Sequence, residues 1–88
     1  MVYCITYELK SSWKDYTQFY EAIKSSGLWW HQSDNIWFIS SSQNAIYIRD
    51  YLKTFMADGD KIFVIKCDKN WAGFGYSQDE YDWLKSNL

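Results

Sequence analysis

The sequence predicts one small α+β domain built on an antiparallel sheet, and three observations support this prediction. The chain has 88 residues, which is the length of a single domain. It contains no proline and no repeat or low-complexity stretch that would mark a linker. Strand-like and helix-like apolar periods follow one another in the order β-α-β-β-α-β. We expect a single domain over 1–88, with its core over 1–67 and a C-terminal loop and helix over 68–88.

The first two elements are a strand and a helix. Residues 2–9 (VYCITYEL) are rich in β-branched and aromatic residues, which favour strands. The apolar residues that follow recur at i, i+3, i+4 and i+7 and therefore share one helix face: Tyr16, Phe19, Tyr20 and Ile23. Gly27 comes directly after this stretch and can close the helix.

A β-hairpin is predicted next. Two short runs, 28–33 (LWWHQS) and 36–40 (IWFIS), flank Asp34 and Asn35. These two residues tolerate the left-handed conformations of a tight turn. The hairpin concentrates three tryptophans and the only histidine of the chain in one place.

A second helix and a last core strand follow the hairpin. Ser41 or Ser42 can cap this helix at its N-terminus. Its buried stripe is expected from residues at helical spacing: Ala45, Ile48, Leu52 and Phe55. The segment 58–60 (DGD) ends the helix, and 61–67 (KIFVIKC) predicts a strand.

The tail is expected to form a loop and a third helix. Residues 71–76 (WAGFGY) predict the loop. Ser77 and Glu80 have the spacing of a capping box, which predicts a helix over 78–87.

The order β-α-β-β-α-β is the split β-α-β arrangement of ferredoxin-like folds, in which the first and third strands are central and both helices cover one face. A sheet with water on its other face should alternate between apolar and polar residues. The strand 36–39 is apolar throughout, and 61–67 places Phe63 and Ile65 on the face opposite Ile62 and Val64. Either the tail or a second subunit must cover this second face, and we expect a homodimer.

Composition excludes several classes of function. The net charge is −2 and Arg49 is the only arginine, which argues against a protein that grips duplex DNA through many phosphates. No P-loop, G-x-G-x-x-G or G-x-S-x-G motif is present, so the sequence gives no support for a nucleotide triphosphatase, a dinucleotide-dependent enzyme or a serine hydrolase. Cys4 and Cys67 lack the spacing of a zinc site and are expected to be small buried residues of adjacent strands rather than a disulfide or a redox pair. No stretch is long and apolar enough to span a membrane, so a cytoplasmic protein without membrane contacts is expected.

Four short segments resemble a group of small bacterial and phage proteins labelled SinR-like, which are related to the small subunit of CRISPR adaptation and to VapD-like toxins. The matching segments are Thr6-Tyr7-Glu8-Leu9, Trp29-Trp30-His31, Ile48-Arg49-Asp50-Tyr51-Leu52 and Trp83-Leu84-Lys85. The resemblance implies a ferredoxin-like homodimer over almost the whole chain. In the CRISPR and VapD relatives an aspartate at the end of the first strand serves metal-dependent phosphodiester cleavage, and Glu8 stands at the matching position. The resemblance therefore implies Mg²⁺ or Mn²⁺ at Glu8, assisted by His31, if the protein is a nuclease; otherwise no cofactor is expected.

The aromatic residues lead to a different hypothesis. Indole rings make good platforms for nucleobases, and a guanidinium can hold a phosphate in a bidentate way. The candidate ligand-binding residues are Trp29, Trp30, Trp37, Arg49, Tyr47 and Thr6. Several of the candidates also have a structural interpretation. The tryptophans can be core or interface residues, and Arg49 can be a solvated helix charge. His31, the nuclease candidate, can be a half-exposed or hydrogen-bonded edge residue.

The function predicted first is a non-catalytic dimeric module that binds a small nucleotide or a short single-stranded nucleic acid. By the resemblance to phage proteins, such a module would sequester a defence-signalling nucleotide. The alternatives are a metal-dependent endonuclease of the CRISPR-adaptation or VapD-like type, and a structural protein-interaction subunit.

Overall fold

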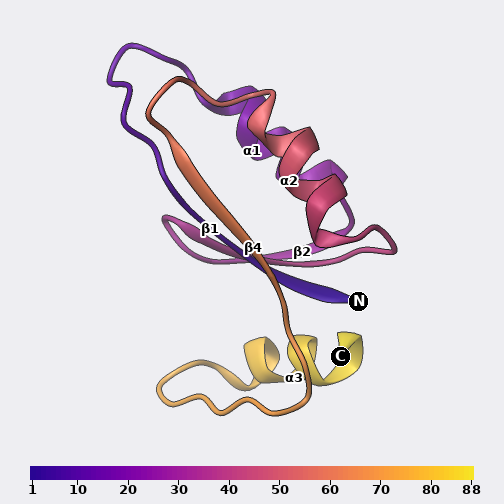
Figure 1. Ribbon diagram of the computed structural model, residues 1–88. Helices are drawn as coiled ribbons and strands as arrows, with labels where there is room; N and C mark the ends of the chain where they lie inside the picture. Colours follow the sequence, from indigo (N-terminus) through magenta and orange to yellow (C-terminus); the bar gives the residue numbers. More distant parts are fainter.

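The computed structural model describes all residues 1–88 and contains the predicted elements in the predicted order (Figure 1). The strands are β1 (Val2–Glu8), β2 (Leu28–Ser33), β3 (Ile36–Ser40) and β4 (Lys61–Lys66). The helices are α1 (Thr17–Ser25), α2 (Ala45–Lys53) and α3 (Gln78–Asn87). None of the three helices has the length and apolar character that a membrane span requires.

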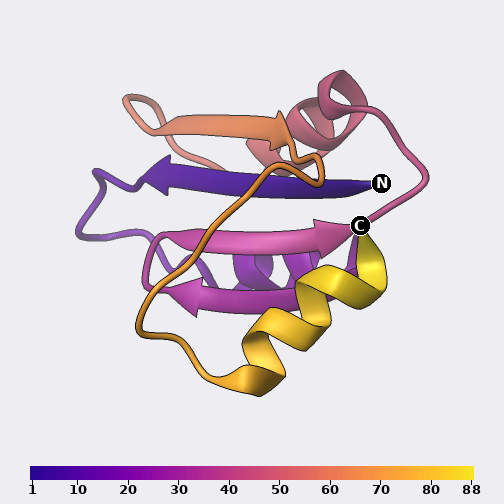
Figure 2. The ribbon, with the colours of Figure 1, turned by 90° about the horizontal axis from the view of Figure 1, so that it is seen from below.

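The four strands form one antiparallel sheet in the order β2-β3-β1-β4, which places β1 and β3 at its centre (Figure 2). Both α1 and α2 lie on one side of this sheet, which we call the helix face, and α3 lies on the opposite side, the tail face (Figure 1). The chain is thus a three-layer arrangement in which the sheet is covered from both sides.

The main core lies between the helix face and the two core helices. Successive residues of β1 alternate between the two faces: Tyr3, Ile5 and Tyr7 are buried in this core, while Cys4 and Thr6 are half-buried on the tail face. Both helices contribute the predicted apolar stripes, of which Phe19, Ile23, Ile48 and Leu52 are fully buried, and Ala22 is buried beside them. Trp37 of β3 is 2% exposed and belongs to the same core.

Two local predictions were wrong. The N-cap of α2 is Asn44, whose side-chain oxygen accepts from the Tyr47 backbone N–H at 2.8 Å. The Ser41 hydroxyl accepts from the Gln43 N–H within a turn before the helix, and Ser42 does not cap it either. The hairpin turn contains no left-handed residue, because a bulge between His31 and Ser33 adjusts the twist of β2 instead.

Gly27 separates α1 from β2, but it acts through close approach rather than as a left-handed cap. Ser26 occupies the C-cap position in a right-handed conformation, and Gly27 follows with φ of 158°. A Cβ at Gly27 would overlap the backbone carbonyl oxygen of Ser40. The chain therefore needs glycine here because the start of β2 lies against the end of β3.

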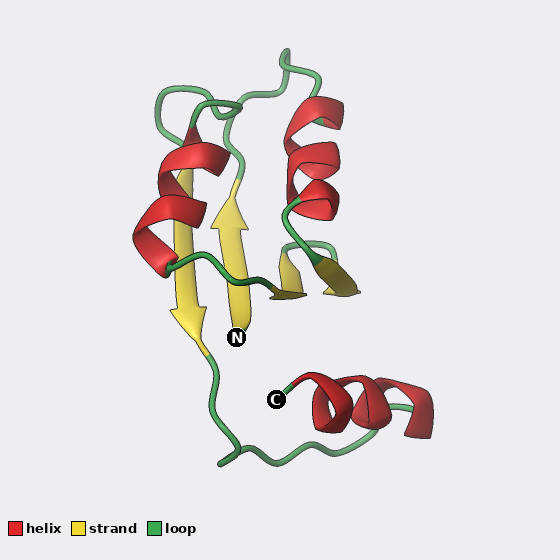
Figure 3. Cartoon of the chain, turned by 90° about the vertical axis from the view of Figure 1, so that its right-hand side faces the viewer, coloured by secondary structure: helices red, strands yellow, loops and turns green.

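The tail, residues 68–88, covers part of the tail face. Its loop crosses the sheet from β4 toward β2, and α3 then runs back along β2 and β3 (Figures 2 and 3). The predicted capping box of α3 is present: the Ser77 N–H donates to Glu80 Oε1 at 3.1 Å, and the Glu80 N–H donates to Ser77 Oγ at 3.3 Å. The tail and a second subunit were the two covers considered for this face, and the tail does cover part of it.

Part of the tail face stays open on the β4 side. Phe63 and Ile65 are 71% and 55% exposed, although they lie beside Thr6 and Cys4 of the central strand β1. Two large apolar side chains on neighbouring positions of one strand leave an exposed patch that the tail does not reach.

Asp60 links the loop that follows β1 to the loop that precedes β4 through hydrogen bonds. Its carboxylate accepts from the backbone N–H groups of Lys10 and Ala57, each at 2.7 Å, and from the Tyr16 hydroxyl at 2.8 Å. Partial burial of this carboxylate raises its pKa, but the three hydrogen bonds outweigh that effect and hold the pKa of Asp60 below its ordinary value.

We expect Asp60→Asn to lower the free energy of unfolding at pH 7 by about 1 kcal/mol, since an amide cannot accept all three bonds and the site is partly open to solvent. A lowered native pKa stabilises the fold above the unfolded pKa of about 3.9, and this contribution is lost as the pH falls through the native pKa. Urea unfolding from pH 7 to pH 2 should therefore show the two proteins converging below about pH 4. Asp58→Asn, at an exposed neighbour, is the control and should change little; an equal loss there would contradict the role of Asp60.

Candidate ring-stacking site

The tryptophans of the hairpin lie on two different faces of the sheet, as the alternation of β2 predicts. Trp29 and His31 are on the helix face, at the edge that α1 leaves open, while Trp30 is on the tail face. The predicted ligand-binding residues therefore do not form one site. Two aromatic sites result, one on each face, and they meet at the edge of β2, where Trp29, Trp30, His31 and Trp83 line a shared hollow.

The site on the helix face is a ring shelf, defined by Tyr20, Lys24, Trp29, His31, Asp34 and Trp37. Its base is the buried indole of Trp37. The His31 imidazole stacks on that indole at 3.8 Å between ring centroids and an interplanar angle of 8°, and Trp29 lies at 5.4 Å with a tilt of 52°. The Tyr20 ring is nearly parallel to the same indole at 6.4 Å. These contacts hold the exposed rings of Trp29 and His31 in fixed orientations.

Hydrogen bonds from β1 fix the base of the ring shelf. The Trp37 Nε1–H donates to the Tyr7 hydroxyl at 2.9 Å, and that hydroxyl donates to the Asp34 carbonyl at 2.8 Å. Burial raises the pKa of Tyr7 to about 12, so the hydroxyl keeps its proton and the chain of bonds persists throughout the neutral range. The orientation of Trp37 is thus set by the central strand rather than by the hairpin alone.

The ring shelf has one cation and one anion. The Lys24 ammonium lies 5.3 Å from the centroid of the Trp29 ring, within the range of a cation–π contact. Its only ion pair, with Glu21 at 3.7 Å, is on the exposed surface and holds it weakly. Asp34 stands at the opposite end, at the hairpin turn. The hollow between these groups measures about 550 Å³ and is open to solvent.

This arrangement can bind a flat ring and a nearby anion at the same time. Trp29 is 43% exposed and His31 is exposed, so both offer ring surface to a ligand. The flexible stem of Lys24 lets its ammonium leave Glu21 and meet a negative group beside the stacked ring.

The remaining predicted ligand-binding residues lie elsewhere. Trp30 stacks on Phe38 at 4.9 Å on the tail face, where Thr6 also lies. Tyr47 and Arg49 are exposed on α2, and the Arg49 guanidinium pairs with Asp50 at 2.9 Å. That pairing matches the interpretation of Arg49 as a solvated helix charge. The structure does not bring any of these four residues to the ring shelf.

Glu8 and His31, the residues implied for a nuclease, are also apart. Glu8 lies at the end of β1 on the tail face, beside Lys10 at 3.5 Å and Lys61 at 3.9 Å. His31 lies on the helix face of β2, with β3 between the two strands. A metal at Glu8 would have to compete with two ammonium groups, and no group of three or more His, Cys, Asp or Glu side chains stands ready to hold a metal ion.

The two cysteines are free and half-buried on the adjacent strands β1 and β4. Burial, with the nearby Cys67, raises the pKa of the Cys4 thiol to about 11, and burial also raises the pKa of Cys67. Both therefore remain neutral thiols, as expected of small core-like residues.

Sequence reasoning missed Tyr20, Lys24 and Asp34 as members of the ring shelf. Tyr20 was assigned to the core and Asp34 to the turn. The position of Lys24 could have been predicted from the sequence. It comes one residue after Ile23 of the buried stripe, which places it on the flank of α1 that faces the hairpin.

Comparison of the chain with protein-family models, with curated proteins and with solved structures finds no match.

Proposed function

We propose that the protein is a non-catalytic binding module whose ring shelf holds the base of a small nucleotide or of a short single-stranded nucleic acid. The observation that carries this proposal is the stack of His31 on the buried Trp37, which leaves the rings of Trp29 and His31 exposed beside Lys24. Base stacking supplies the affinity, and Lys24 meets a phosphate.

The charges of the site limit the class of nucleic acid. A single ammonium neutralises about one phosphate, whereas proteins that hold duplex DNA neutralise many. The net charge of −2 also disfavours a long polyanion. A mononucleotide, a dinucleotide or a few unpaired nucleotides fit the ring shelf better than a duplex does. A module that binds without reacting acts by holding its ligand. If this chain is a phage protein, as its resemblance suggests, the role of such binding would be to sequester a defence-signalling nucleotide.

We expect Trp29→Ala to weaken the binding of a fluorescently labelled single-stranded oligonucleotide by about 5- to 150-fold, the equivalent of 1–3 kcal/mol for one lost stack. Fluorescence anisotropy measures this change. Trp13→Ala removes an indole that is 83% exposed and lies outside the ring shelf, and it should leave the affinity unchanged. Equal affinity of the wild type and the Trp29 variant would reject the site.

Lys24→Gln tests the phosphate contact separately. The slope of log K against log salt should become smaller by about 0.7, the value of one released counterion for a single strand. An unchanged slope would remove Lys24 from the proposed contact while leaving the stacking intact.

We also infer a ferredoxin-like homodimer. The strand order β2-β3-β1-β4 with α1 and α2 on one face supports the fold assignment. The exposed patch of Phe63 and Ile65 supports association through the open part of the tail face, where a second copy would bury both side chains.

Sedimentation analysis should accordingly give a dimer for the wild type and a monomer for the double variant Phe63→Glu/Ile65→Glu, because buried carboxylates would face each other across the interface. Ile46→Glu changes a side chain that is 63% exposed on α2, away from the patch, and should remain dimeric. A wild-type chain that stays monomeric at the highest concentration reached would contradict the inference.

A further inference from the structure

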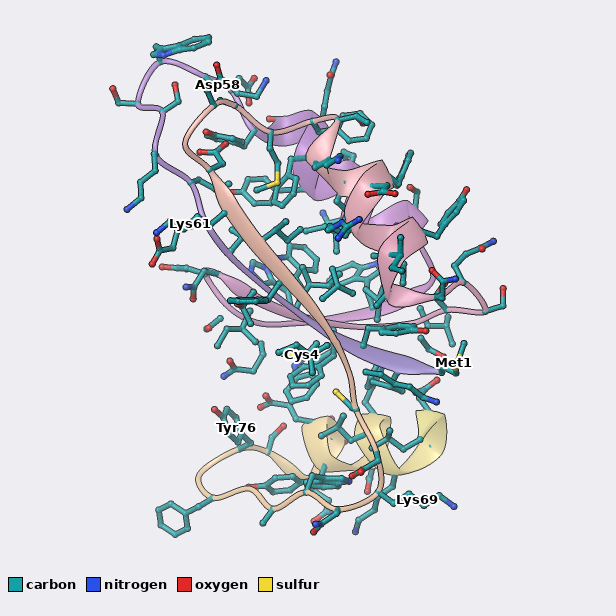
Figure 4. The ribbon with its side chains drawn as sticks, in the orientation of Figure 1. Met1, Cys4, Asp58, Lys61, Lys69 and Tyr76 are labelled. Atoms are coloured by element: carbon teal, nitrogen blue, oxygen red, sulfur yellow. The ribbon has the colours of Figure 1, made fainter.

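The tail does not pack flat on the sheet but leaves a cleft of about 320 Å³, which we call the tail cleft. Its sheet side includes Cys4, Trp30 and Phe38, and its tail side includes Trp71 and Tyr81. Figure 4 shows Cys4 on the sheet and Tyr76 on the tail, on either side of the layer of side chains between them. The volume lies within the range of sites that hold small molecules, about 300–1,000 Å³.

Stacked rings build both walls of the tail cleft. On the sheet, Trp30 lies parallel to Phe38 at 4.9 Å and 17°. On the tail, Trp71 lies parallel to Tyr81 at 6.0 Å and 19°. A Cβ at Gly73 would come within 2.7 Å of the Tyr81 ring, so the tail loop lies directly against this wall. The rings are thus held by one another and form a rigid lining.

A hydrogen bond joins the two walls at one side. The Gln32 side-chain amide donates to the Tyr76 hydroxyl at 2.9 Å, and the Tyr76 N–H donates to the Tyr81 hydroxyl at 3.2 Å. Leu84, 8% exposed, anchors α3 behind them. These contacts keep the tail at a distance from β1 instead of letting it collapse onto Cys4.

The lining is almost uncharged. Eleven of the fourteen residues around the tail cleft are hydrophobic, and Asp68 is the only one with a charged side chain. No lysine or arginine lines it, so a phosphate would find no cation there. Cys4 and Cys67 contribute neutral thiols, because burial raises the pKa of both. Water in such a space finds few hydrogen-bond partners, and an empty space forfeits dispersion contacts on both walls.

We propose that the tail cleft is a binding site for one small, uncharged and mainly apolar molecule with a flat ring system. An aromatic ligand suits a lining that includes five aromatic rings, those of Trp30, Phe38, Trp71, Tyr76 and Tyr81, and the lack of charge on the ligand follows from the single charged side chain in that lining. Gln32 and the hydroxyl of Tyr76 are the polar groups that orient the ligand at the edge of the site. This site is on the opposite face from the ring shelf and takes a different class of ligand, so it is independent of the function proposed above.

The neutral fluorescent probe N-phenyl-1-naphthylamine tests this site in the full-length protein. The wild type should give a saturable rise in probe fluorescence with one probe per chain. Cys4→Phe places a ring in the cleft and should weaken probe binding at least tenfold, whereas Trp13→Ala, which removes an exposed indole outside both sites, should bind the probe as the wild type does. A rise that does not saturate, or one that Cys4→Phe leaves unchanged, would overturn the proposal.

Protection of the thiols supplies a test that needs no variant. Both cysteines line the tail cleft, so bound probe should slow their alkylation by N-ethylmaleimide at least severalfold, as followed by mass spectrometry of the intact wild-type chain. Alkylation of the chain at the same rate with and without saturating probe would place the probe elsewhere and refute the site. An oligonucleotide bound to the ring shelf should leave the alkylation rate unchanged, which separates this result from failure of the nucleotide-binding proposal.

Discussion

Trp37→Ala is expected to lower the free energy of unfolding by about 3–5 kcal/mol, the usual cost of truncating a fully buried tryptophan. The side chain is 2% exposed and contacts the rings of Tyr20, Trp29 and His31. A domain of 88 residues has a total stability of about 4–13 kcal/mol. The variant should therefore be close to the unfolding threshold at 25 °C and also lose the base of the ring shelf.

Urea unfolding followed by circular dichroism measures this loss as a fall in the midpoint at an unchanged m-value. Tyr7→Phe separates packing from hydrogen bonding, because it keeps the ring and leaves the buried Trp37 Nε1–H without its acceptor. It should cost about 1–3 kcal/mol. A Trp37→Ala variant less than 1 kcal/mol below the wild type would contradict the placement of this indole in the core.

Gly27→Ala is the second variant with a large expected effect, about 2–4 kcal/mol of destabilisation. The added methyl group meets the carbonyl of Ser40, and both partners of this clash are backbone atoms. Relief requires movement of β2 relative to β3, which would also weaken the pairing of Leu28 with Ser40. Thermal unfolding should show the loss as a clearly lower Tm.

Gly59→Ala is the matched control for that experiment. Gly59 has φ of 87°, and a Cβ there meets no atom within 4 Å. The substitution therefore carries only the conformational cost of a left-handed alanine, about 1–2 kcal/mol. If both variants lost the same stability, the contact between Gly27 and Ser40 would not be the cause.

The elements of this fold were predictable from the sequence because each has a clear apolar period. The 3.6-residue period of α1 and the alternation of β1 placed Phe19 and Ile5 in the core correctly. The N-cap of α2 was not predictable, because the run 40–44 contains four residues of capping type and only the turn before the helix selects Asn44. The conformation of the hairpin turn was not predictable for a similar reason. The bulge in β2 depends on how β2 pairs with β3, and the two turn residues do not encode that pairing.

The candidate site was predictable only in part. The period of two in a strand is enough to place Trp29 and Trp30 on opposite faces, as they are in β2. The contact between Lys24 of α1 and Trp29 of β2 could not be predicted from alternation, because it depends on how the helix packs on the sheet. Arg49 was a candidate phosphate contact because of its chemistry alone, and the packing of α2 on the β4 side places it far from the hairpin in the fold.

The tail cleft was beyond sequence reasoning. The apolar strands 36–39 and 61–67 indicated that the tail face needs a cover. Whether that cover lies flat or leaves a space depends on the sizes of Trp71, Tyr81 and Trp30 and on how their rings meet, which no periodicity encodes.

The most direct test of the ring shelf is a ¹H–¹⁵N and aromatic NMR titration of the wild-type protein with a short single-stranded oligonucleotide. Stacking on the shelf predicts saturable shifts of the Trp29 indole, the His31 ring and the Lys24 amide, with the indoles of Trp13 and Trp71 unchanged. Shifts confined to α2 around Arg49, shifts confined to Glu8 and its neighbours, or no shifts at saturating ligand would each contradict the account.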